Sequence, residues 1–410
     1  MSLLSVQEAR ERILSHFQPV SVETLPLANC TNRVLAVDIA AAIDLPLFAN
    51  SSMDGFAVRS ADVVNAAADS CVTLRVVADI PAGAATKVSL AEDEAARIMT
   101  GAPMPQGADS VVPVEDTDFD HREAGTAAPK EVQISRPVKA GDFVRPRGAD
   151  VRAGQVVLRA GCELKAQDIG MLAMLGTARV QIYRRPRVAL LSSGDELLAV
   201  DAPLESGKIR DSNSYMLAAL IQDAGAEVAN LGIAADLREA VEVLLEKAVR
   251  EKADLILSSA GVSVGAFDFV REAVEANGRM DFWRVNMRPG KPLAFGNYSG
   301  IPFIGLPGNP VSAFVGFEVF VRPAIQRMSG LSDRNRPKVR VRCAEGIESD
   351  GRESYLRAVV FEERGILTAK LTGHQGSGNL LSVVQANALL IIPAGVKSLA
   401  TGQEVDAWLL

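Results

Sequence analysis

Residues 187–223 read RVALLSSGDELLAVDAPLESGKIRDSNSYMLAALIQD, a short apolar run followed by a stretch with apolar residues at helical spacing. Further apolar runs occur at AEVANLGIA (226–234), ADLILSSAG (253–261) and IPFIGLPG (301–308), and helical patterns separate or follow them. The last helical pattern covers residues 310–328. Alternating strands and helices of this length predict right-handed βαβ units and a mostly parallel sheet with helices on both faces.

On either side of this α/β region the apolar pattern changes to a period of two. Residues 51–140 contain strand-like runs such as CVTLRVVADI (71–80), which predict a compact β-rich unit. Inside that unit, the acidic start of AEDEAARIM (91–99) predicts one short helix. After the polar segment LSDRNRP (331–337), the remaining chain alternates again and predicts a small β-barrel or sandwich.

Composition narrows the function classes. The chain has 410 residues, net charge −7 and 5% aromatic residues, which argues against a nucleic-acid-binding protein. Its four cysteines lie far apart without a C-x-x-C pair, as is typical of buried thiols in a reducing compartment. No apolar run approaches about 18 residues and the start does not resemble a signal peptide, so we expect a cytoplasmic, soluble protein without a membrane partner.

Acidic, glycine-rich and basic segments follow the predicted strands. In an open parallel sheet, ligands bind where the carboxyl ends of the strands run into loops. The segments that follow the strands are Gly-Asp-Glu at 194–196, Asp236, the glycine-rich run 261–268, Arg-Pro-Gly-Lys at 288–291 and Pro-Gly-Asn at 307–309. The sequence therefore predicts one ligand site at this edge of the sheet.

The residue types in these segments indicate an anion and a divalent cation. Arg288 and Lys291 flank Pro-Gly, and a fork-shaped guanidinium with a compact ammonium suits a tetrahedral oxyanion. Glu196, Asp236 and Asp268 are candidate ligands for Mg²⁺, which takes one or two carboxylates together with phosphate oxygens. Simpler roles stay open for each segment: Asp236 could cap a helix, and Arg288 and Lys291 could be solvated. Neither G-x-G-x-x-G after the first strand nor a P-loop motif is present, which argues against a Rossmann dehydrogenase and a P-loop NTPase.

Eight motifs in order resemble the molybdopterin molybdenumtransferase (MoeA) family, which is related to the gephyrin E domain. The resemblance covers essentially the whole chain. The motifs are NSSMDGFAV (50–58), RIMTGAPMPQGADSVVPVED (97–116), RPRGAD (145–150), LSSGDEL (191–197), IRDSN (209–213), LSSAGVSVGAFDF (257–269), MRPGKPLAFG (287–296) and GLPGNPVSAFV (305–315).

The resemblance implies a reaction and an architecture. Molybdate is inserted into adenylylated molybdopterin, with Mg²⁺-dependent release of AMP, as the last step of molybdenum cofactor biosynthesis. The implied fold is multidomain α/β, with a MogA/MoaB-like three-layer α/β/α domain, an inserted β-rich domain and a C-terminal β-barrel-like domain. The implied domains are residues 1–50 with 141–180 as linker and dimer domain, 51–140 as the insert, 181–330 as the MogA-like domain, and 331–410. The implied assembly is a homodimer whose active cleft combines the β-rich domain of one subunit with the α/β domain of the other.

The resemblance also assigns roles to residues. Asp54, Thr100 and Asp150 would join Glu196, Asp236 and Asp268 as catalytic residues, and the last three would also hold Mg²⁺. Arg288 and Lys291 would hold molybdate, with oxyanion contacts from Arg357 and Ser377 in the C-terminal domain. The remaining substrate-binding positions would be Gly194, Ser258, Gly261, Ser263, Gly265, Pro307, Gly308 and Asn309.

Two other functions remain open from the sequence. The α/β unit could itself adenylylate molybdopterin, as a MogA-like enzyme does, or the chain could be a non-catalytic scaffold that binds the pterin or a partner protein. A MogA-like adenylyltransferase and molybdoenzyme maturation proteins are possible partners. Nothing in the sequence distinguishes molybdate from tungstate as the substrate.

Overall fold

The computed structural model describes residues 3–84, 87–120, 125–259, 267–331 and 336–410. Two compact units make up the chain. The first unit comprises Met1–Val37, Ala160–Leu172 and Thr177–Leu410, and the second comprises Asp38–Arg159 and Ala173–Gly176.

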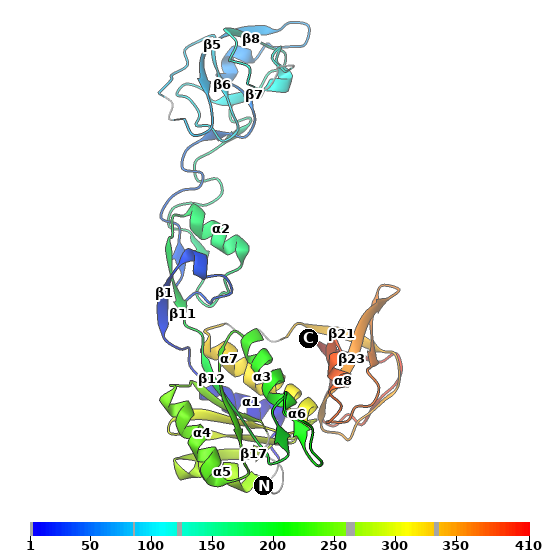
Figure 1. Cartoon of the computed structure of the whole chain (residues 1–410). Helices are drawn as coiled ribbons and strands as arrows, with labels where there is room; N and C mark the ends of the chain where they lie inside the picture. The colour runs from blue at the N-terminus through cyan, green and yellow to red at the C-terminus, as the bar shows by residue number, and fades with distance from the viewer. Residues whose placement is uncertain (1–2, 85–86, 121–124, 260–266, 332–335) are drawn as a thin grey trace. The chain divides into compact units, whose positions relative to one another are not determined.

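A six-stranded sheet forms the centre of the first unit (Figure 1). Its pairings make five strands run in one direction and only β19 in the other, which confirms the mostly parallel sheet. In spatial order the strands are β15 (Glu227–Ala234), β12 (Arg187–Ser193), β16 (Leu255–Ser259), β20 (Ile301–Leu306), β19 (Pro292–Tyr298) and β17 (Gly278–Arg284).

Helices cover both faces of this sheet, as the alternation of strands and helices predicts. Along β12, Val188 and Leu190 pack into one apolar cluster, whereas Ala189 and Leu191 pack into the other, because successive side chains of a strand point to opposite faces. The first cluster includes residues of α1 (Val6–Ser15), α3 (Ser212–Asp223), α6 (Pro310–Gly316) and α7 (Arg322–Met328). The second includes residues of α4 (Arg238–Arg250) and α5 (Phe267–Ala276).

The stretch 310–328 is helical throughout, as predicted, but its middle is widened. The segment η4 (Phe317–Val321) is a π-helix between α6 and α7, and all five of its residues are buried. Single π-turns of this kind occur often near functional or specially packed positions.

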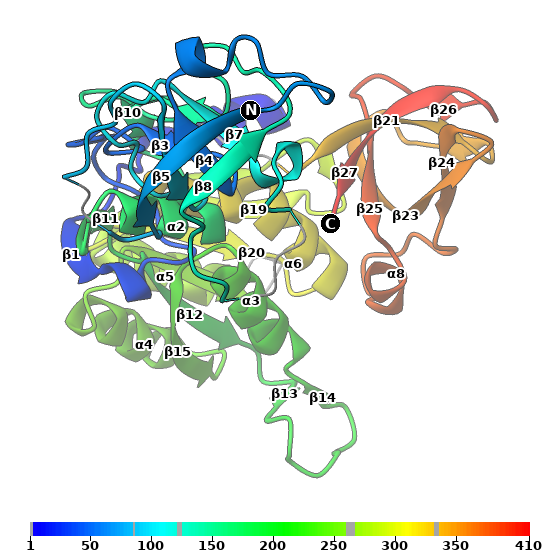
Figure 2. The ribbon, with the colours of Figure 1, turned by 90° about the horizontal axis from the view of Figure 1, so that it is seen from above.

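A short strand pair leaves the sheet before α3. β13 (Leu197–Leu198) pairs in parallel with β14 (Ile209–Arg210), and the loop that connects them extends away from the α/β domain (Figure 2). The backbone N–H of Asp211 donates to the carbonyl of Leu198 at 2.9 Å, which returns the chain to the start of α3.

The last part of the first unit is a closed five-stranded barrel, which confirms the β-barrel prediction (Figure 2). The barrel order is β23 (Glu353–Glu363), β24 (Ile366–Leu371), β21 (Lys338–Cys343), β27 (Glu404–Leu409) and β25 (Ala388–Ile392), and β25 pairs back with β23. The smaller elements of the barrel region are β22 (Ile347–Glu348), β26 (Ser398–Leu399) and α8 (Leu381–Val384). The two-residue strand β18 (Met287–Arg288) pairs in parallel with β23 and so joins the α/β region to the barrel.

The second unit is built on a five-stranded sheet of order β7-β4-β6-β5-β8. The bounds are β4 (Gly55–Val58), β5 (Val72–Ile80), β6 (Glu94–Ile98), β7 (Ser110–Pro113) and β8 (Glu131–Ile134). The helix predicted for residues 91–99 is wrong, because this stretch holds strand β6. Four of the five β6 residues are buried, so pairing with both β4 and β5 outweighs the local helical signal.

The remaining elements are short. In the first unit, β1 (Val22–Pro26) pairs antiparallel with β11 (Arg179–Tyr183). The short helix η1 (Leu27–Asn29) follows β1 in the chain. The second unit also contains β2 (Ile39–Ala40), β3 (Asn50–Ser51), η2 (Ser60–Val63), η3 (Val114–Asp116), β9 (Val144–Arg145) and β10 (Val156–Leu158). Helix α2 (Ala166–Met174) ends before Gly176, whose φ of +75° a glycine adopts readily, as the sequence predicts. No helix in the described residues is both long and apolar enough to span a membrane.

Candidate active site at the carboxyl edge of the sheet

The strand register brings the predicted loops to one edge of the sheet. Ser193, the last residue of β12, pairs with Ala234 of β15, and Ser259 of β16 pairs with Leu306 of β20. The described residues that follow these strand ends are therefore neighbours: Gly194 to Glu196, Asp236, and Pro307 to Asn309. The segment 260–266 after β16 lies outside the described residues. Because β17 runs in the same direction, the loop that carries Arg288 and Lys291 also begins at this edge.

Acidic side chains gather where β12 and β15 end. The backbone N–H of Asp236 donates to Asp195 Oδ1 at 3.1 Å, while Asp236 Oδ1 is buried without a hydrogen-bond partner. Burial raises the pKa of the Asp236 carboxyl, and the negative charges of Asp195 and Glu196 raise it further. Helix α4 has Leu237 as its N-cap residue and no side-chain cap, so Asp236 is not a helix cap.

Gly194 is required by the packing of this acidic turn. Its φ is +149°, and a Cβ atom at this position would lie 2.7 Å from Glu196 Oε2. Any side chain at residue 194 would therefore displace the Glu196 carboxylate.

The acidic residues fit a hydrated divalent cation. In the part of the chain that the structure describes, no group of three or more His, Cys, Asp or Glu side chains is arranged as a complete metal site. Mg²⁺ needs only one or two protein carboxylates, and the unpaired Asp236 oxygen beside Glu196 is the kind of ligand it takes. Asp268 lies in the first turn of α5, but its side chain is outside the described residues, as are Gly261, Ser263 and Gly265.

Further unpaired polar atoms lie at the ends of β12 and β16. The hydroxyls of Ser193 and Ser258 are buried and have no hydrogen-bond partner among the described residues. Leu191 pairs with Ser258, and side chains two residues apart share a face, so Ser193 and Ser258 project from the same face of the sheet. Buried polar groups left unpaired by the protein are typical of positions that a ligand completes.

Arg357, on β23 of the barrel, has a fully buried guanidinium without a carboxylate partner among the described residues. Its Nε donates to Ser382 Oγ at 3.0 Å and its Nη2 to the carbonyl of Gly376 at 3.1 Å, but Nη1 has no acceptor. Burial lowers the pKa of Arg357 to about 10, and the positive charge of Arg288 contributes to this shift. The group remains a cation at neutral pH, and an anion that reached Nη1 would supply the acceptor that the described residues do not.

Arg288 connects this anion position to the edge of the sheet. Its backbone is paired with Ser354 of β23, and its Nη1 lies 4.0 Å from Asp350 Oδ2. Lys291 follows in the same loop and is exposed, and its carbonyl accepts from the N–H of Val285 at 3.0 Å. The structure thus places Arg288 next to β23, the strand that carries Arg357, while Lys291 lies immediately before β19.

The predicted residues Asn309 and Ser377 are hydrogen-bonded to each other. Asn309 Nδ2 donates to Ser377 Oγ at 3.1 Å, and the N–H of Val311 donates to the Ser377 carbonyl at 3.0 Å. Asn309 is the N-cap residue of α6, with Pro310 in the first turn, as Gly-Asn-Pro predicts.

Two of the predicted residues in the second unit also meet. Asp54 Oδ1 accepts from the backbone N–H of Thr100 at 2.7 Å and from its Oγ1 at 2.8 Å. The third, Asp150, forms an ion pair with Arg145 at 2.6 Å. The distant motifs M-D-G-F and M-T-G-A-P therefore form one contact within this unit.

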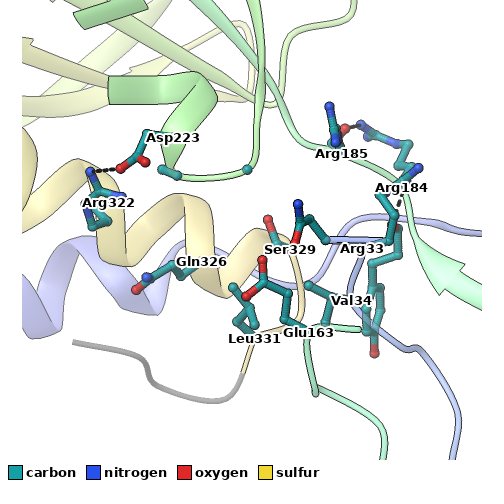
Figure 3. A pocket seen from close by; sticks show the side chains of 14 residues that line it. Arg33, Val34, Glu163, Arg184, Arg185, Asp223, Arg322, Gln326, Ser329 and Leu331 are labelled. Atoms are coloured by element: carbon teal, nitrogen blue, oxygen red, sulfur yellow. Dashed lines mark hydrogen bonds and ion pairs between the residues drawn. The ribbon is translucent and has the colours of Figure 1, made fainter. Parts of the chain in front are cut away.

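A separate cavity of about 110 Å³ lies at the opposite, amino-terminal ends of β12 and β15 (Figure 3). Three of the arginines that line it already have partners within the chain. Arg33 contacts Glu23 at 2.5 Å, Arg184 contacts Asp254 at 2.6 Å, and Arg322 contacts Asp223 at 2.9 Å. This cavity is distinct from the candidate site, because it lies at the amino-terminal edge of the sheet and these three arginines already have carboxylate partners.

Comparison with known families accounts for nearly the whole chain. Residues 4–176 match the MoeA N-terminal region (domain I and II), residues 189–327 a probable molybdopterin binding domain, and residues 340–410 the MoeA C-terminal region (domain IV). The molybdopterin molybdenumtransferase of a Nostoc species is 40% identical over 93% of this chain and 87% of its own length. The chain belongs to the molybdopterin molybdenumtransferase (MoeA) family.

Other MoeA relatives agree in sequence and in structure. Molybdopterin molybdenumtransferase 2 of Mycobacterium tuberculosis is 38% identical over 98% of this chain and 99% of its own. The crystal structure of the molybdopterin biosynthesis moeA protein from Pyrococcus horikoshii OT3 has a TM-score of 0.83 and 30% identity, and the match covers all of both chains. This family is a family of transferases that serves molybdenum cofactor biosynthesis.

Sequence reasoning gave no role to several groups at the candidate site. Ser193 and Asn213 lie in the quoted motifs LSSGDEL and IRDSN but received no role. The partners of Arg357, Gly376 and Ser382, come from a loop and from α8, where no short motif marks them. Gly376 and Ser382 are identified only by their hydrogen bonds to the buried Arg357 in the folded structure.

Proposed function

We propose that this chain inserts molybdate into adenylylated molybdopterin and releases AMP in a Mg²⁺-dependent reaction, the last step of molybdenum cofactor biosynthesis. The observation that carries this proposal is the buried Arg357 guanidinium, which has an unpaired Nη1 and no carboxylate partner among the described residues. Arg288 is paired to the same strand, β23, at Ser354. A tetrahedral oxyanion such as molybdate would complete this position.

The two charged regions support a division of roles. Glu196, Asp236 and Asp268 would hold Mg²⁺, which supplies positive charge beside the phosphate that leaves as AMP. The glycine-rich run around Gly261 and the turn at Pro307 to Asn309 would bind the phosphates and the pterin. Arg288, Lys291, Arg357 and Ser377 would hold molybdate, and Asp54, Thr100 and Asp150 would contribute from the β-rich unit.

The chain's own contribution would be positioning and charge. Holding molybdate beside the dithiolene sulfurs converts a bimolecular encounter into a reaction between oriented groups. Each sulfur would then replace one oxygen of molybdate, and the displaced oxygens would leave as water with the thiol protons. Molybdenum would keep its oxidation state, and a covalent enzyme intermediate would not be needed. A homodimer, supplied by a MogA-like adenylyltransferase and passing its product to molybdoenzyme maturation proteins, is part of this proposal.

The test is incubation of the purified chain with adenylylated molybdopterin, Mg²⁺ and molybdate, with AMP release and protein-bound molybdenum followed together. We expect molybdate-dependent formation of both products. Glu196→Gln and Asp268→Asn should reduce AMP release by at least about a thousandfold, because a neutral amide oxygen binds Mg²⁺ much more weakly than a carboxylate does. Unchanged circular dichroism would show that the fold is retained.

The same assay separates the alternatives. Consumption of ATP with unadenylylated molybdopterin in the absence of molybdate would identify a MogA-like adenylyltransferase. Tight pterin binding without either product would identify a scaffold. Undiminished turnover by both acidic variants would reject the roles given to Glu196 and Asp268.

A further inference from the structure

Asn213 lies in the first turn of α3 and is only 8% exposed. Its Nδ2 donates to the carbonyl of Gly308 at 2.8 Å, whereas its Oδ1 is buried without a hydrogen-bond partner. A single side chain thus ties the start of α3 to the turn that follows β20.

The orientation of this amide is fixed by its partner. A backbone carbonyl only accepts hydrogen bonds, so Nδ2 must face Gly308 and Oδ1 must face away from it. A buried oxygen without a partner is unfavourable for stability. Helix α3 does not need Asn213 as a cap either, because Asp211 already accepts from the N–H of Ser214 at 3.0 Å. Asn213 is therefore not needed to cap α3. What its side chain contributes is the hydrogen bond to the Gly308 carbonyl.

The Gly308 turn leads directly to the anion position. Its next residue, Asn309, donates to Ser377 Oγ at 3.1 Å, and the N–H of Val311 donates to the Ser377 carbonyl at 3.0 Å. Gly376, beside Ser377, accepts from Arg357 Nη2 at 3.1 Å. A continuous set of hydrogen bonds and short chain segments therefore runs from α3 to the buried guanidinium.

We propose that Asn213 is a positioning residue of the anion site. By holding the Gly308 carbonyl, it keeps Asn309 and Val311 against Ser377, and so keeps the loop at Gly376 in place around Arg357. Asn213 does not itself contact the anion. This inference rests on the proposed function, because it takes molybdate as the anion at Arg357.

The experiment measures molybdate binding to the full-length chain by isothermal titration calorimetry. Asn213→Ala should raise the Kd for molybdate about tenfold, the effect of one lost hydrogen bond in a buried network. Asn213→Leu should give the same increase, because it restores the volume but not the donor. In turnover, the KM for molybdate should rise with little change in kcat.

A double-mutant cycle tests the route through Ser377. If Asn213 acts through that residue, the Asn213→Ala/Ser377→Ala double variant should bind molybdate about as weakly as Ser377→Ala alone rather than a further tenfold more weakly. A purely structural defect would instead add to the Ser377 effect. Additive effects would therefore overturn the proposal.

Asn277→Ala is the matched control. Asn277 also donates one Nδ2 hydrogen bond, to Tyr298 Oη at 3.3 Å, but at the amino-terminal edge of the same sheet. Its variant should keep the wild-type Kd. Wild-type affinity in Asn213→Ala would overturn the inference and leave the proposed function standing, whereas a wild-type chain that binds no molybdate would count against both.

Discussion

Arg357 shows how one residue can be unfavourable for folding and useful for binding. Among the described residues, the guanidinium has two hydrogen-bond acceptors, the Ser382 hydroxyl and the Gly376 carbonyl. A buried cation without a counter-charge keeps a large desolvation penalty. That penalty makes the site attractive to an anion, because binding supplies the missing negative charge.

This reasoning predicts opposite effects of Arg357→Met on stability and on binding. The free energy of unfolding should rise or stay within about 1 kcal/mol of the wild type, because an apolar side chain replaces an uncompensated charge. The Kd for molybdate should rise about a hundredfold, the effect of losing a charge-assisted hydrogen bond. Urea unfolding and calorimetry measure the two quantities.

Arg322→Met provides the contrast. Arg322 is also buried, but its Nε donates to Glu318 Oε2 at 2.8 Å and its Nη2 to Asp223 Oδ2 at 2.9 Å. Removing it should destabilise the chain by about 3–5 kcal/mol, because the buried Glu318 loses a partner. A comparable loss of stability in Arg357→Met, with molybdate affinity retained, would show that Arg357 is structural.

At the residue scale, the sequence predicted the positions that short motifs mark. The resemblance pointed to Asp54 and Thr100, and the structure joins them by two hydrogen bonds. Asn213 could not be predicted in the same way, because its partner Gly308 is 95 residues away in the chain. Which atom of an amide stays unpaired is decided only by folding.

At the element scale, patterns held where burial and periodicity agreed. The apolar run at 187–193 became β12 in the centre of the sheet, and the helical pattern at 310–328 became one continuous helical stretch. The helix expected at 91–99 is wrong. Alanines and acidic residues favour a helix locally, but β6 pairs with β4 on one side and β5 on the other, and this pairing outweighs the local preference. The apolar period carries no signal for the π-turn at Phe317–Val321, whose five residues are all buried.

The π-turn carries a buried ionic network that makes stability depend on pH. Glu318, whose side chain has 0% exposure, accepts from Arg322 and also from Arg336 Nε at 2.9 Å. Burial alone would raise the pKa of the Glu318 carboxyl, but the hydrogen bonds from Arg336 and Arg322 outweigh burial and leave that pKa below its ordinary value of 4.5. The carboxylate therefore stabilises the fold in its charged form.

Glu318→Gln should lower the free energy of unfolding by about 3 kcal/mol at neutral pH, because the buried Arg322 and the partly buried Arg336 lose their buried carboxylate partner and keep only the exposed Asp223. Because the pKa of Glu318 is lower in the folded chain, the unfolded chain binds more protons near pH 4.5. The stabilisation from Glu318 is therefore fully present above pH 4.5 and is lost as the pH falls through the folded-state pKa. The difference between wild type and variant should shrink in acid. Urea unfolding at a series of pH values measures it.

Asp223→Asn is the control for this network. Asp223 contacts the same two arginines, but its side chain is 62% exposed. Its replacement should change the free energy of unfolding by no more than about 1 kcal/mol. A pH-independent difference between wild type and Glu318→Gln would contradict the assignment of the charged form to Glu318.

At the scale of the whole molecule, the candidate residues fall in two separate compact units. Asp54 and Thr100 belong to the unit that holds the five-stranded sheet, whereas Glu196, Arg288 and Arg357 belong to the unit that holds the α/β domain and the barrel. The family resemblance predicts a homodimer in which each active cleft takes the β-rich domain from one subunit and the α/β domain from the other. Mixing defective subunits tests that prediction.

With molybdate held well below the raised Kd of Arg357→Met, Asp54→Asn and Arg357→Met should each show little turnover as homodimers. When the two variants are co-expressed, half of the dimers should be mixed, and each mixed dimer should contain one cleft that carries neither substitution. Turnover should therefore return to about a quarter of the wild-type value. Co-expression of Arg357→Met with Glu196→Gln is the control, because both residues lie in the same unit and every cleft of the mixed dimer carries a defect. If each cleft used a single subunit, both mixtures would stay inactive, so the difference between them identifies a shared cleft.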